Sequence, residues 1–188
     1  MMKKTIKRQK IKDGAVVKIN ISDNRLIFGR LMKSRIAIYD FIVLESEVLP
    51  DVEIIISKPI FLYCKVYNDV ITKGFFEIIA LKELTETEIE KIPPGFTQDI
   101  VDINKCVIYY HDGREFKARP QDCIGLERSS VWEAEGLAER IQDYYSGKKN
   151  YHVELMKPIL SINDPRYLPP PNAMRWDFEK GEFYRTDK

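Results

Sequence analysis

The fold is decided from residue 11 to residue 41, where the sequence reads IKDGAVVKINISDNRLIFGRLMKSRIAIYDF. Short runs rich in Val, Ile, Phe and Tyr start there and continue along the chain, at residues 15–21, 25–31, 35–41, 53–57 and 60–67. Turn residues such as Ser22-Asp23-Asn24 and Pro50-Asp51 separate them, and runs punctuated in this way are typical of β-strands. The sequence therefore predicts five strands of an antiparallel meander.

The chain continues with β-prone segments after this meander. Residues 74–81, GFFEIIAL, are a further strand candidate, and the acidic stretch 83–90 is expected to form a helical turn that Pro93-Pro94-Gly95 ends. Residues 105–119, KCVIYYHDGREFKAR, are two β-prone runs joined by Asp112-Gly113. This dipeptide tolerates the positive φ angles of a tight turn, so the segment predicts a hairpin.

One amphipathic helix is predicted within residues 127–148. Its apolar face is built from Val131, Ala134, Leu137, Ala138, Ile141, Tyr144 and Tyr145, which recur at steps of three and four. Ser129 or Ser130 is expected to cap the helix, with Glu133 completing a capping box, and Gly147 is expected to end it. The predicted fold class is α+β: an antiparallel, strongly twisted sheet or partly open barrel with this helix packed on it.

The character of the chain changes after Met156. Five of the ten prolines fall in residues 158–171, so residues 157–188 are expected to be an extended tail, separate from an α+β domain at residues 1–156. The tail carries the aromatic residues Tyr167, Trp176, Phe178, Phe183 and Tyr184. Aromatic side chains are costly to leave in water, so we expect the tail to pack on its own domain or on another chain.

The bulk composition bounds the class of protein. The 188 residues include 30 basic and 29 acidic side chains, and a net charge of +1 argues against nucleic acid as an obligatory partner. The three cysteines, Cys64, Cys106 and Cys123, are odd in number and far apart, which favours a reducing cytoplasm over a disulfide framework. We expect neither a signal peptide nor a membrane span, because no apolar run has the required length.

The chain offers few groups for catalysis or for binding a cofactor. Of its two histidines, His111 precedes the Asp-Gly turn and His152 lies in a segment expected to be extended. Cys106 and His111 are five residues apart on a predicted strand, so their side chains would point to opposite faces. No glycine-rich phosphate loop is present. We therefore expect no catalytic residue, no metal site and no cofactor.

Acidic residues gather in two segments. They are Glu45, Glu47, Asp51 and Glu53 in the first, and Glu83, Glu86, Glu88 and Glu90 in the second. Solvated loops are the ordinary explanation, and a paired-carboxylate hydrolase site would need a supporting base that the chain lacks. Such clusters also suit a surface that steers a basic protein partner.

The polar pair Gly29-Arg30 interrupts one of the apolar runs. Strand alternation places Arg30 on the same face as Phe28 and Met32, whereas Gly29 lies where the backbone bends or is closely approached. We interpret the pair as structural and hypothesise that Arg30 pairs with Asp40 of the neighbouring strand to satisfy a half-buried charge.

The order of these features resembles the immunity protein 26 family of bacterial polymorphic toxin systems, over about residues 11–155. The residues that carry the resemblance, interpreted as structural, are Phe28, Gly29, Arg30, Asp40, Gly125, Leu126, Glu127, Trp132, Arg140 and Gly147. The resemblance implies a cytoplasmic antidote that neutralises a cognate toxin by direct binding, with no enzymatic activity. The acidic segments are then expected to face a basic toxin.

Two alternatives stay open. A small β-barrel module that binds nucleic acid would draw on the basic leader at residues 3–12 and on Tyr109-Tyr110. An uncharacterised enzyme is the other, and alanine at His111, Asp40 and Glu127 would test it. The tail aromatics also leave open a homodimer that forms through the C-terminal tail.

Overall fold

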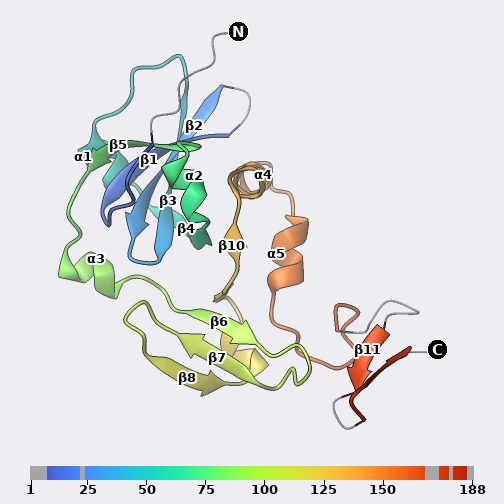
Figure 1. The fold of residues 1–188 in the computed structure, drawn as a ribbon. Coiled ribbons are helices and arrows are strands. Elements are labelled where there is room, and N and C mark those ends of the chain that lie inside the picture. The colour runs from blue at the N-terminus through green and yellow to red at the C-terminus, as the bar shows by residue number, and fades with distance from the viewer. Residues whose placement is uncertain (1–7, 22–23, 168–173, 178–179, 186–188) are drawn as a thin grey trace.

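The computed structural model describes residues 8–21, 24–167, 174–177 and 180–185. It is a mixed α+β protein in which a six-stranded sheet curls into a half-barrel (Figure 1). A four-stranded sheet lies beside the half-barrel, and a separate two-stranded hairpin follows near the C-terminus. The predicted fold class is confirmed.

The six-stranded sheet contains the predicted meander. In spatial order β10-β4-β3-β2-β1-β5, its strands are β1 (Ala15–Asn20), β2 (Arg25–Met32), β3 (Arg35–Leu44), β4 (Ile60–Val66), β5 (Phe76–Leu81) and β10 (Val131–Trp132). Consecutive strands from β1 to β4 pair antiparallel, and β5 returns to pair with β1. The short strand β10 runs parallel to β4 at the opposite edge.

The curl of this sheet has a local cause. Register shifts interrupt the ladders of β1 with β5, β2 with β3, and β3 with β4, and such bulges bend the strands that contain them. At the shift in β2, a Cβ atom on Gly29 would lie 2.8 Å from Ile36 Cδ1. Gly29 therefore allows β3 side chains to approach the backbone closely, as the sequence interpretation expected.

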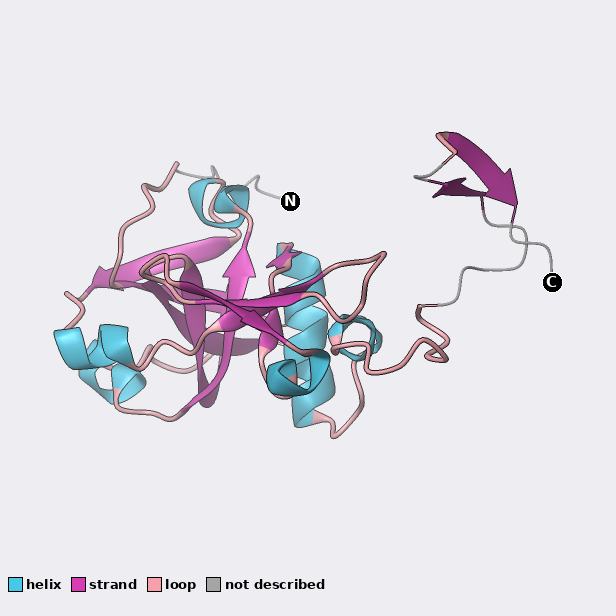
Figure 2. Ribbon diagram, turned by 90° about the horizontal axis from the view of Figure 1, so that it is seen from below, coloured by secondary structure: helices cyan, strands magenta, loops and turns pink. Residues whose placement is uncertain are grey.

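Helices cover both faces of the six-stranded sheet. On one face α4 (Ala134–Tyr145) buries Leu137 and Ile141 completely against inward residues of the strands, as predicted for the amphipathic helix. Figure 2 shows this helix lying along the sheet. On the other face α1 (Val52–Ile56) buries Ile55 against Phe28 and Tyr39. Alternate residues of each strand thus enter two separate cores.

The strand predicted at residues 53–57 is wrong, because these residues form most of α1. Asp51 caps the helix by accepting a hydrogen bond from the Glu53 N–H at 3.0 Å. Of the three consecutive isoleucines, Ile55 is fully buried whereas Ile54 is 49% exposed. A strand preference of β-branched residues is weak, and here the N-cap and the one-sided burial outweigh it.

The start of the long helix also differs from the prediction. Residues 127–132 pair as strands: β9 (Glu127–Arg128) runs parallel to β6, and β10 follows. Helix α4 therefore begins after Glu133, and the Ser130–Glu133 capping box is not formed. The burial of Trp132 beside β4 explains the displacement, since tertiary pairing overrides local helix preference. The predicted helix end at Gly147 is confirmed by its φ of +65°.

The four-stranded sheet includes the predicted hairpin. Its order is β8-β7-β6-β9, with β6 (Gly95–Gln98), β7 (Cys106–Tyr109) and β8 (Glu115–Ala118). The turn that joins β7 to β8 contains Gly113 at a φ of +88°. A small apolar cluster of Phe96, Cys106 and Cys123 lies beneath it. Three short helices lie between strands: α2 (Asn68–Thr72) joins β4 to β5, α3 (Glu86–Glu90) lies between the two sheets, and the 3-10 helix η1 (Pro120–Cys123) joins β8 to β9.

The C-terminal part begins with a second correction. His152 lies in α5 (Tyr151–Met156) and not in an extended segment, because Asn150 caps this helix through a 3.1 Å bond from the Val153 N–H. Residues 157–167 contain no helix or strand. Strands β11 (Met174–Asp177) and β12 (Glu182–Arg185) then pair antiparallel, and Figure 2 shows them apart from the two sheets.

The domain boundary after residue 156 stays a prediction. Of the tail aromatics, the Tyr167 hydroxyl donates to the Val101 carbonyl oxygen at 2.9 Å. The side chains of Trp176, Phe178, Phe183 and Tyr184 lie outside the residues that are described at side-chain level.

Candidate functional site

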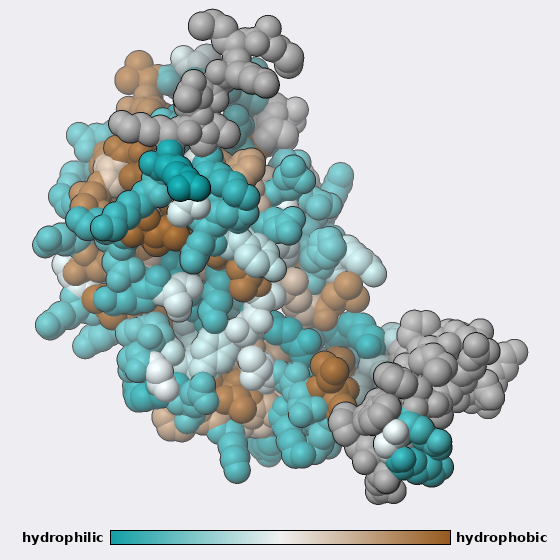
Figure 3. Space-filling model, viewed as in Figure 1, coloured by the Kyte–Doolittle hydropathy of each residue, from teal (hydrophilic) through white to brown (hydrophobic). Residues whose placement is uncertain are grey.

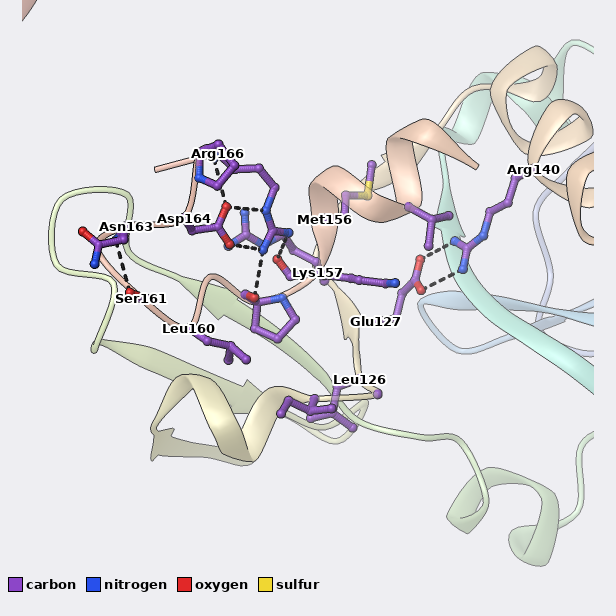
Figure 4. A pocket seen from close by; sticks show the side chains of 16 residues that line it. Leu126, Glu127, Arg140, Met156, Lys157, Leu160, Ser161, Asn163, Asp164 and Arg166 are labelled. Carbon is purple, nitrogen blue, oxygen red and sulfur yellow. Dashed lines mark hydrogen bonds and ion pairs between the residues drawn. The ribbon is translucent and has the colours of Figure 1, made fainter. Parts of the chain in front are cut away.

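A pocket of about 740 Å³ opens where the four-stranded sheet, α4 and α5 meet residues 157–166 (Figure 4). Its lining consists of residues 124–128, 156–158 and 163–166, together with Arg140, Val153, Leu160 and Ser161. Several of the late motif residues thus come together here, contributed by β9, by the turn before it and by α4. Gly125 supplies that turn at a φ of +83°.

The pair Glu127–Arg140 forms one wall of the pocket. Arg140 Nη1 and Nη2 donate to the two carboxylate oxygens of Glu127 at 2.6 and 3.0 Å. The Arg140 guanidinium also lies 4.9 Å above the Trp132 ring. A bidentate pair stacked on an indole fixes β9 against α4, and it leaves neither side chain free to act on a substrate.

The opposite wall is held by Arg166. Its guanidinium pairs with Asp164 and donates to the carbonyl oxygens of Glu154, Lys157 and Pro158, at 2.8, 2.9 and 3.3 Å respectively. The hydrogen bonds from Arg166 lower the pKa of Asp164 to about 2. Residues 157–166 are therefore clamped to the end of α5, although no helix or strand forms in them.

Gln98 links this wall to the four-stranded sheet. It donates to the carbonyl oxygens of Ile103 and Ile159 and accepts from the Ile159 N–H and from Arg128 Nη2, all between 2.7 and 2.9 Å. Burial lowers the pKa of Arg128. Most polar groups described around the pocket thus bond to one another, whereas the buried Arg128 Nε has no hydrogen-bond partner.

Other groups with chemical potential lie elsewhere. The thiols of Cys64 and Cys123 are buried, and burial raises the pKa of each to about 12, which disfavours the nucleophilic thiolate. His152 lies on exposed α5 with its ring edge toward Trp132. In the part of the chain that the structure describes, no three His, Cys, Asp or Glu residues are grouped to hold a metal ion. Nor is any described helix long and apolar enough to cross a bilayer.

The two acidic segments meet at one ion pair beside α1, whereas α3 packs on a separate cluster that includes Met32, Ala37 and Ile92. Lys82 follows β5 and forms an ion pair with Glu53 of α1. Arg30 Nη1 donates to Glu88 Oε1 at 2.6 Å, and Nη2 donates to the carbonyl oxygens of Lys82 and Glu83 at 3.0 and 2.8 Å. These contacts fasten α3 and the end of β5 to the sheet.

Glu88 differs from the other acidic residues. Partial burial alone would raise its pKa, but hydrogen bonds from Thr85 and Arg30 outweigh that effect and lower it. The remaining seven acidic residues, Glu45, Glu47, Asp51, Glu53, Glu83, Glu86 and Glu90, are exposed. Glu88 is thus a structural partner, and any contact with another protein falls to the other seven.

The hypothesis that Arg30 pairs with Asp40 is wrong. Arg30 lies on the face covered by α1, 1% exposed, whereas Asp40 accepts a 2.6 Å hydrogen bond from the Tyr145 hydroxyl of α4 on the other face. This bond and burial raise the pKa of Tyr145. The pairing register explains the error: Arg30 lies opposite Ala37 of β3, and Asp40, three residues further along the alternating strand, therefore faces the other side of the sheet.

Two features of these surfaces escaped the sequence reasoning. Leu44, Val48, Leu49, Ile54 and Leu81 expose apolar side chains next to the acidic residues. In the sequence, the adjacent apolar residues Val48 and Leu49 in a predicted loop were the indication of exposed apolar side chains. The pocket wall built by residues 157–166 was hidden in a segment expected to be extended, where the turn signal Asp164-Pro165 was the only local indication.

The comparisons with known proteins give one family. The family model described as Immunity protein 26 matches residues 12–107. No curated protein and no solved structure matches the chain. The match covers the half-barrel strands β1 to β5 and ends within β7, so the roles assigned to Gly125, Leu126, Glu127, Trp132, Arg140 and Gly147 stay predictions. Because the match extends over more than half of the 188 residues, the chain belongs to the Immunity protein 26 family.

Proposed function

We propose that the protein neutralises a cognate toxin by binding it directly in the cytoplasm, without catalysing a reaction. The observation that carries this proposal is the family match over residues 12–107. An immunity protein of this kind needs a surface that recognises the toxin, supported by a fold rigid enough to present it.

The geometry of the described residues supports binding over chemistry. Both carboxylates that line the pocket beside α5 are paired with arginines, Glu127 with Arg140 and Asp164 with Arg166. The buried thiols of Cys64 and Cys123 have raised pKa values. By contrast, seven exposed carboxylates and several exposed apolar side chains lie near α1 and α3.

The test is protection of cells. The product of the gene adjacent to this one would be expressed alone and together with this protein, both in the cytoplasm. We expect growth arrest in the first case, growth in the second, and a stable complex of the two purified proteins in size-exclusion chromatography. Redirecting this protein to the periplasm with an export signal should abolish protection. Absence of both protection and complex would contradict the proposal.

A nucleic-acid-binding module remains the second candidate, and one observation favours it. The β7–β8 hairpin presents Phe116, which is 53% exposed, and Arg114, whose guanidinium lies 4.8 Å above the Tyr110 ring. Aromatic and basic side chains in this arrangement suit stacking on bases. Titration with mixed-sequence single-stranded oligonucleotides at low salt tests it, and no measurable binding there would exclude it.

A further inference from the structure

The strongest unassigned feature is the lining of the pocket beside α5. Its volume of about 740 Å³ is that of a small-molecule site, for which roughly 300 to 1,000 Å³ is typical. None of the described residues that line it is aromatic. The apolar part of the lining is aliphatic apart from one thioether, and consists of Ile124, Leu126, Val153, Met156, Pro158, Leu160 and Pro165. Such a lining can bury an aliphatic chain, and it offers no ring on which a base could stack.

The charged side chains of the lining are not balanced. They comprise two carboxylates and four cations, and the cations are Arg128, Arg140, Lys157 and Arg166. Three of these cations have carboxylate partners, in the pairs Arg140–Glu127, Arg166–Asp164 and Lys157–Glu154. No carboxylate of the described residues pairs with Arg128. The pocket therefore carries an excess positive charge in its wall. In Figure 3, which has the orientation of Figure 1, brown apolar side chains lie among teal polar ones in the region below α5.

Arg128 is half-buried, and much of its hydrogen-bonding capacity is unused. Nη2 donates to Gln98 Oε1 at 2.8 Å, whereas Nε is buried and has no hydrogen-bond partner. Burial lowers the pKa of Arg128, and the positive charge of Arg166 adds to this effect. A guanidinium that is withdrawn from water near a second guanidinium is stabilised by an anion. The wall at Arg128 is therefore where a negatively charged group fits.

From these features we propose that the pocket binds a small aliphatic carboxylate, with its chain against the aliphatic lining and its carboxylate at Arg128. A carboxylate suits this position because its two oxygens match the planar donors of a guanidinium. The inference goes beyond the proposed function and does not depend on it. The pocket residues lie after residue 107, where the family match ends, so the site is separate from the part of the chain that defines the family.

Charge and shape decide against the other ligands. A cationic ligand would be repelled by Arg128, which has no carboxylate partner. A nucleotide would supply an anion, but its base would find no aromatic side chain among the described lining residues.

The first experiment measures the binding of decanoate by isothermal titration calorimetry, below the concentration at which decanoate forms micelles. Decyltrimethylammonium has the same chain with a positive head group, and butanoate has the same head group with a shorter chain. We expect one decanoate to bind per chain, at least about tenfold more tightly than decyltrimethylammonium, because only the anion can bond to Arg128. Butanoate should also bind at least about tenfold more weakly than decanoate, because it buries fewer methylene groups.

Matched variants test where decanoate binds through its carboxylate. Arg128→Gln should raise the dissociation constant at least about tenfold, and Arg128→Lys, which keeps the charge without the planar guanidinium, should have a smaller effect. The control is Arg114→Gln in the exposed turn between β7 and β8, which should change the dissociation constant by less than about twofold.

A second pair of variants tests the aliphatic wall. Leu160 lines the pocket and is 48% exposed, whereas Ile162 is 63% exposed and is not part of the described lining. Leu160→Asp adds a negative charge to the pocket and should raise the dissociation constant at least about tenfold, while Ile162→Asp should leave it within about twofold. Both positions are exposed, so thermal unfolding without ligand should be the same for the two variants.

Three outcomes would overturn the proposal. They are no decanoate binding by the wild-type protein, equal affinity for decanoate and decyltrimethylammonium, and unchanged decanoate affinity in both Arg128→Gln and Leu160→Asp. If the protein bound no decanoate but Arg128→Gln lost binding to the product of the adjacent gene, the pocket would belong to a protein interface and the small-molecule site would be rejected. Failure of the protein to protect cells would contradict the proposed function and leave the pocket assignment intact.

Discussion

Two arginine–glutamate pairs hold separate elements together, one within the half-barrel and one at its junction with the four-stranded sheet. In the half-barrel, Arg30 is 1% exposed and pairs with Glu88, while its second nitrogen donates to two backbone carbonyl oxygens. At the junction with the four-stranded sheet, the side chains of Arg140 and Glu127 are 14% and 20% exposed and pair with each other, and Arg140 also stacks on the Trp132 ring. The first pair joins a buried arginine to a glutamate near the surface, and the second connects two layers.

The difference reflects how each half is stabilised. The half-barrel has an apolar core on each face of its sheet, so Arg30 ties α3 to a structure that is already closed. The four-stranded sheet has a small apolar cluster, and three of the four residues of β8 are exposed. Polar contacts from Gln98, Arg140 and Arg166 therefore carry a larger share of its attachment. Local openings of low free energy are expected in such a region.

Replacing Arg30 with Met should have the largest effect. It leaves Glu88 and two carbonyl oxygens without their partner, and we expect the free energy of unfolding to fall by about 3 kcal/mol. Denaturant titration followed by circular dichroism measures it. The control is Lys33→Met, which breaks an exposed pair with Asp13 and should cost less than about 1 kcal/mol. Equal stability of the two variants would contradict the embedded role of Arg30.

Replacing Arg140 with Met should loosen the junction without unfolding the half-barrel. We expect a loss of about 1 to 2 kcal/mol, since Glu127 retains some access to water. Hydrogen exchange should speed up in β6, β7 and β9 and stay unchanged in β1 to β3. A double-mutant cycle with Glu127→Gln measures the pair directly, and a uniform rise in exchange over both sheets would refute the division into two halves.

Acid should weaken the Arg166 clamp in a defined range of pH. The pKa of Asp164 is about 2 in the folded protein, below the usual value of about 3.9, so its ionised form favours folding. The contribution, about 1 kcal/mol at this partly exposed site, is present above about pH 4 and is lost as the pH falls toward 2. Asp164→Asn should remove this dependence in stability curves. Added to Arg166→Gln, it should have a smaller effect, because only the backbone N–H of residue 166 then still donates to the Asp164 carboxylate.

Ending the chain after Tyr167 should have the smallest effect on stability. The contacts that fix residues 157–167 come from Gln98, Arg166 and Tyr167, and all of them are retained. We expect a change below about 0.5 kcal/mol in denaturant titration. Light scattering of both forms tests the proposed homodimer: a dimer that becomes a monomer on truncation supports exchange through the tail, and a monomer in both forms rejects it.

Much of the half-barrel was predictable because its information is local. Runs such as residues 15–21 and 35–41 have strand composition and turn residues beside them, and Gly29 marked a close approach of the backbone. The Asp112-Gly113 turn and the helix end at Gly147 need positive φ angles that few residues adopt. These features depend on neighbours within a few positions.

The predictions were wrong where residues distant in the sequence determine the local structure or the pairing partner. Residues 53–56 form a helix because Ile55 packs against the sheet. Within residues 127–132, β9 forms because it pairs with β6, and β10 forms because it pairs with β4. Arg30 pairs with Glu88, which is 58 positions away in the sequence, and not with Asp40 on the adjacent strand. The pocket wall at residues 157–166 has no periodic signal and is held by hydrogen bonds from Arg166 and by Gln98, about 60 positions away.

By itself the sequence determined the α+β class, the segments that form strands β1 to β5, the amphipathic helix and the excess of acidic residues in two segments. These follow from side-chain periodicity, turn chemistry and charge, which are properties of short stretches of chain. Only the tertiary structure decided that Arg30 is a core residue, that Glu53 of one acidic segment pairs with Lys82 beside the other, and that Glu127 pairs with Arg140. Such pairings depend on register, bulges and burial, which are settled when remote elements compete for the same partners.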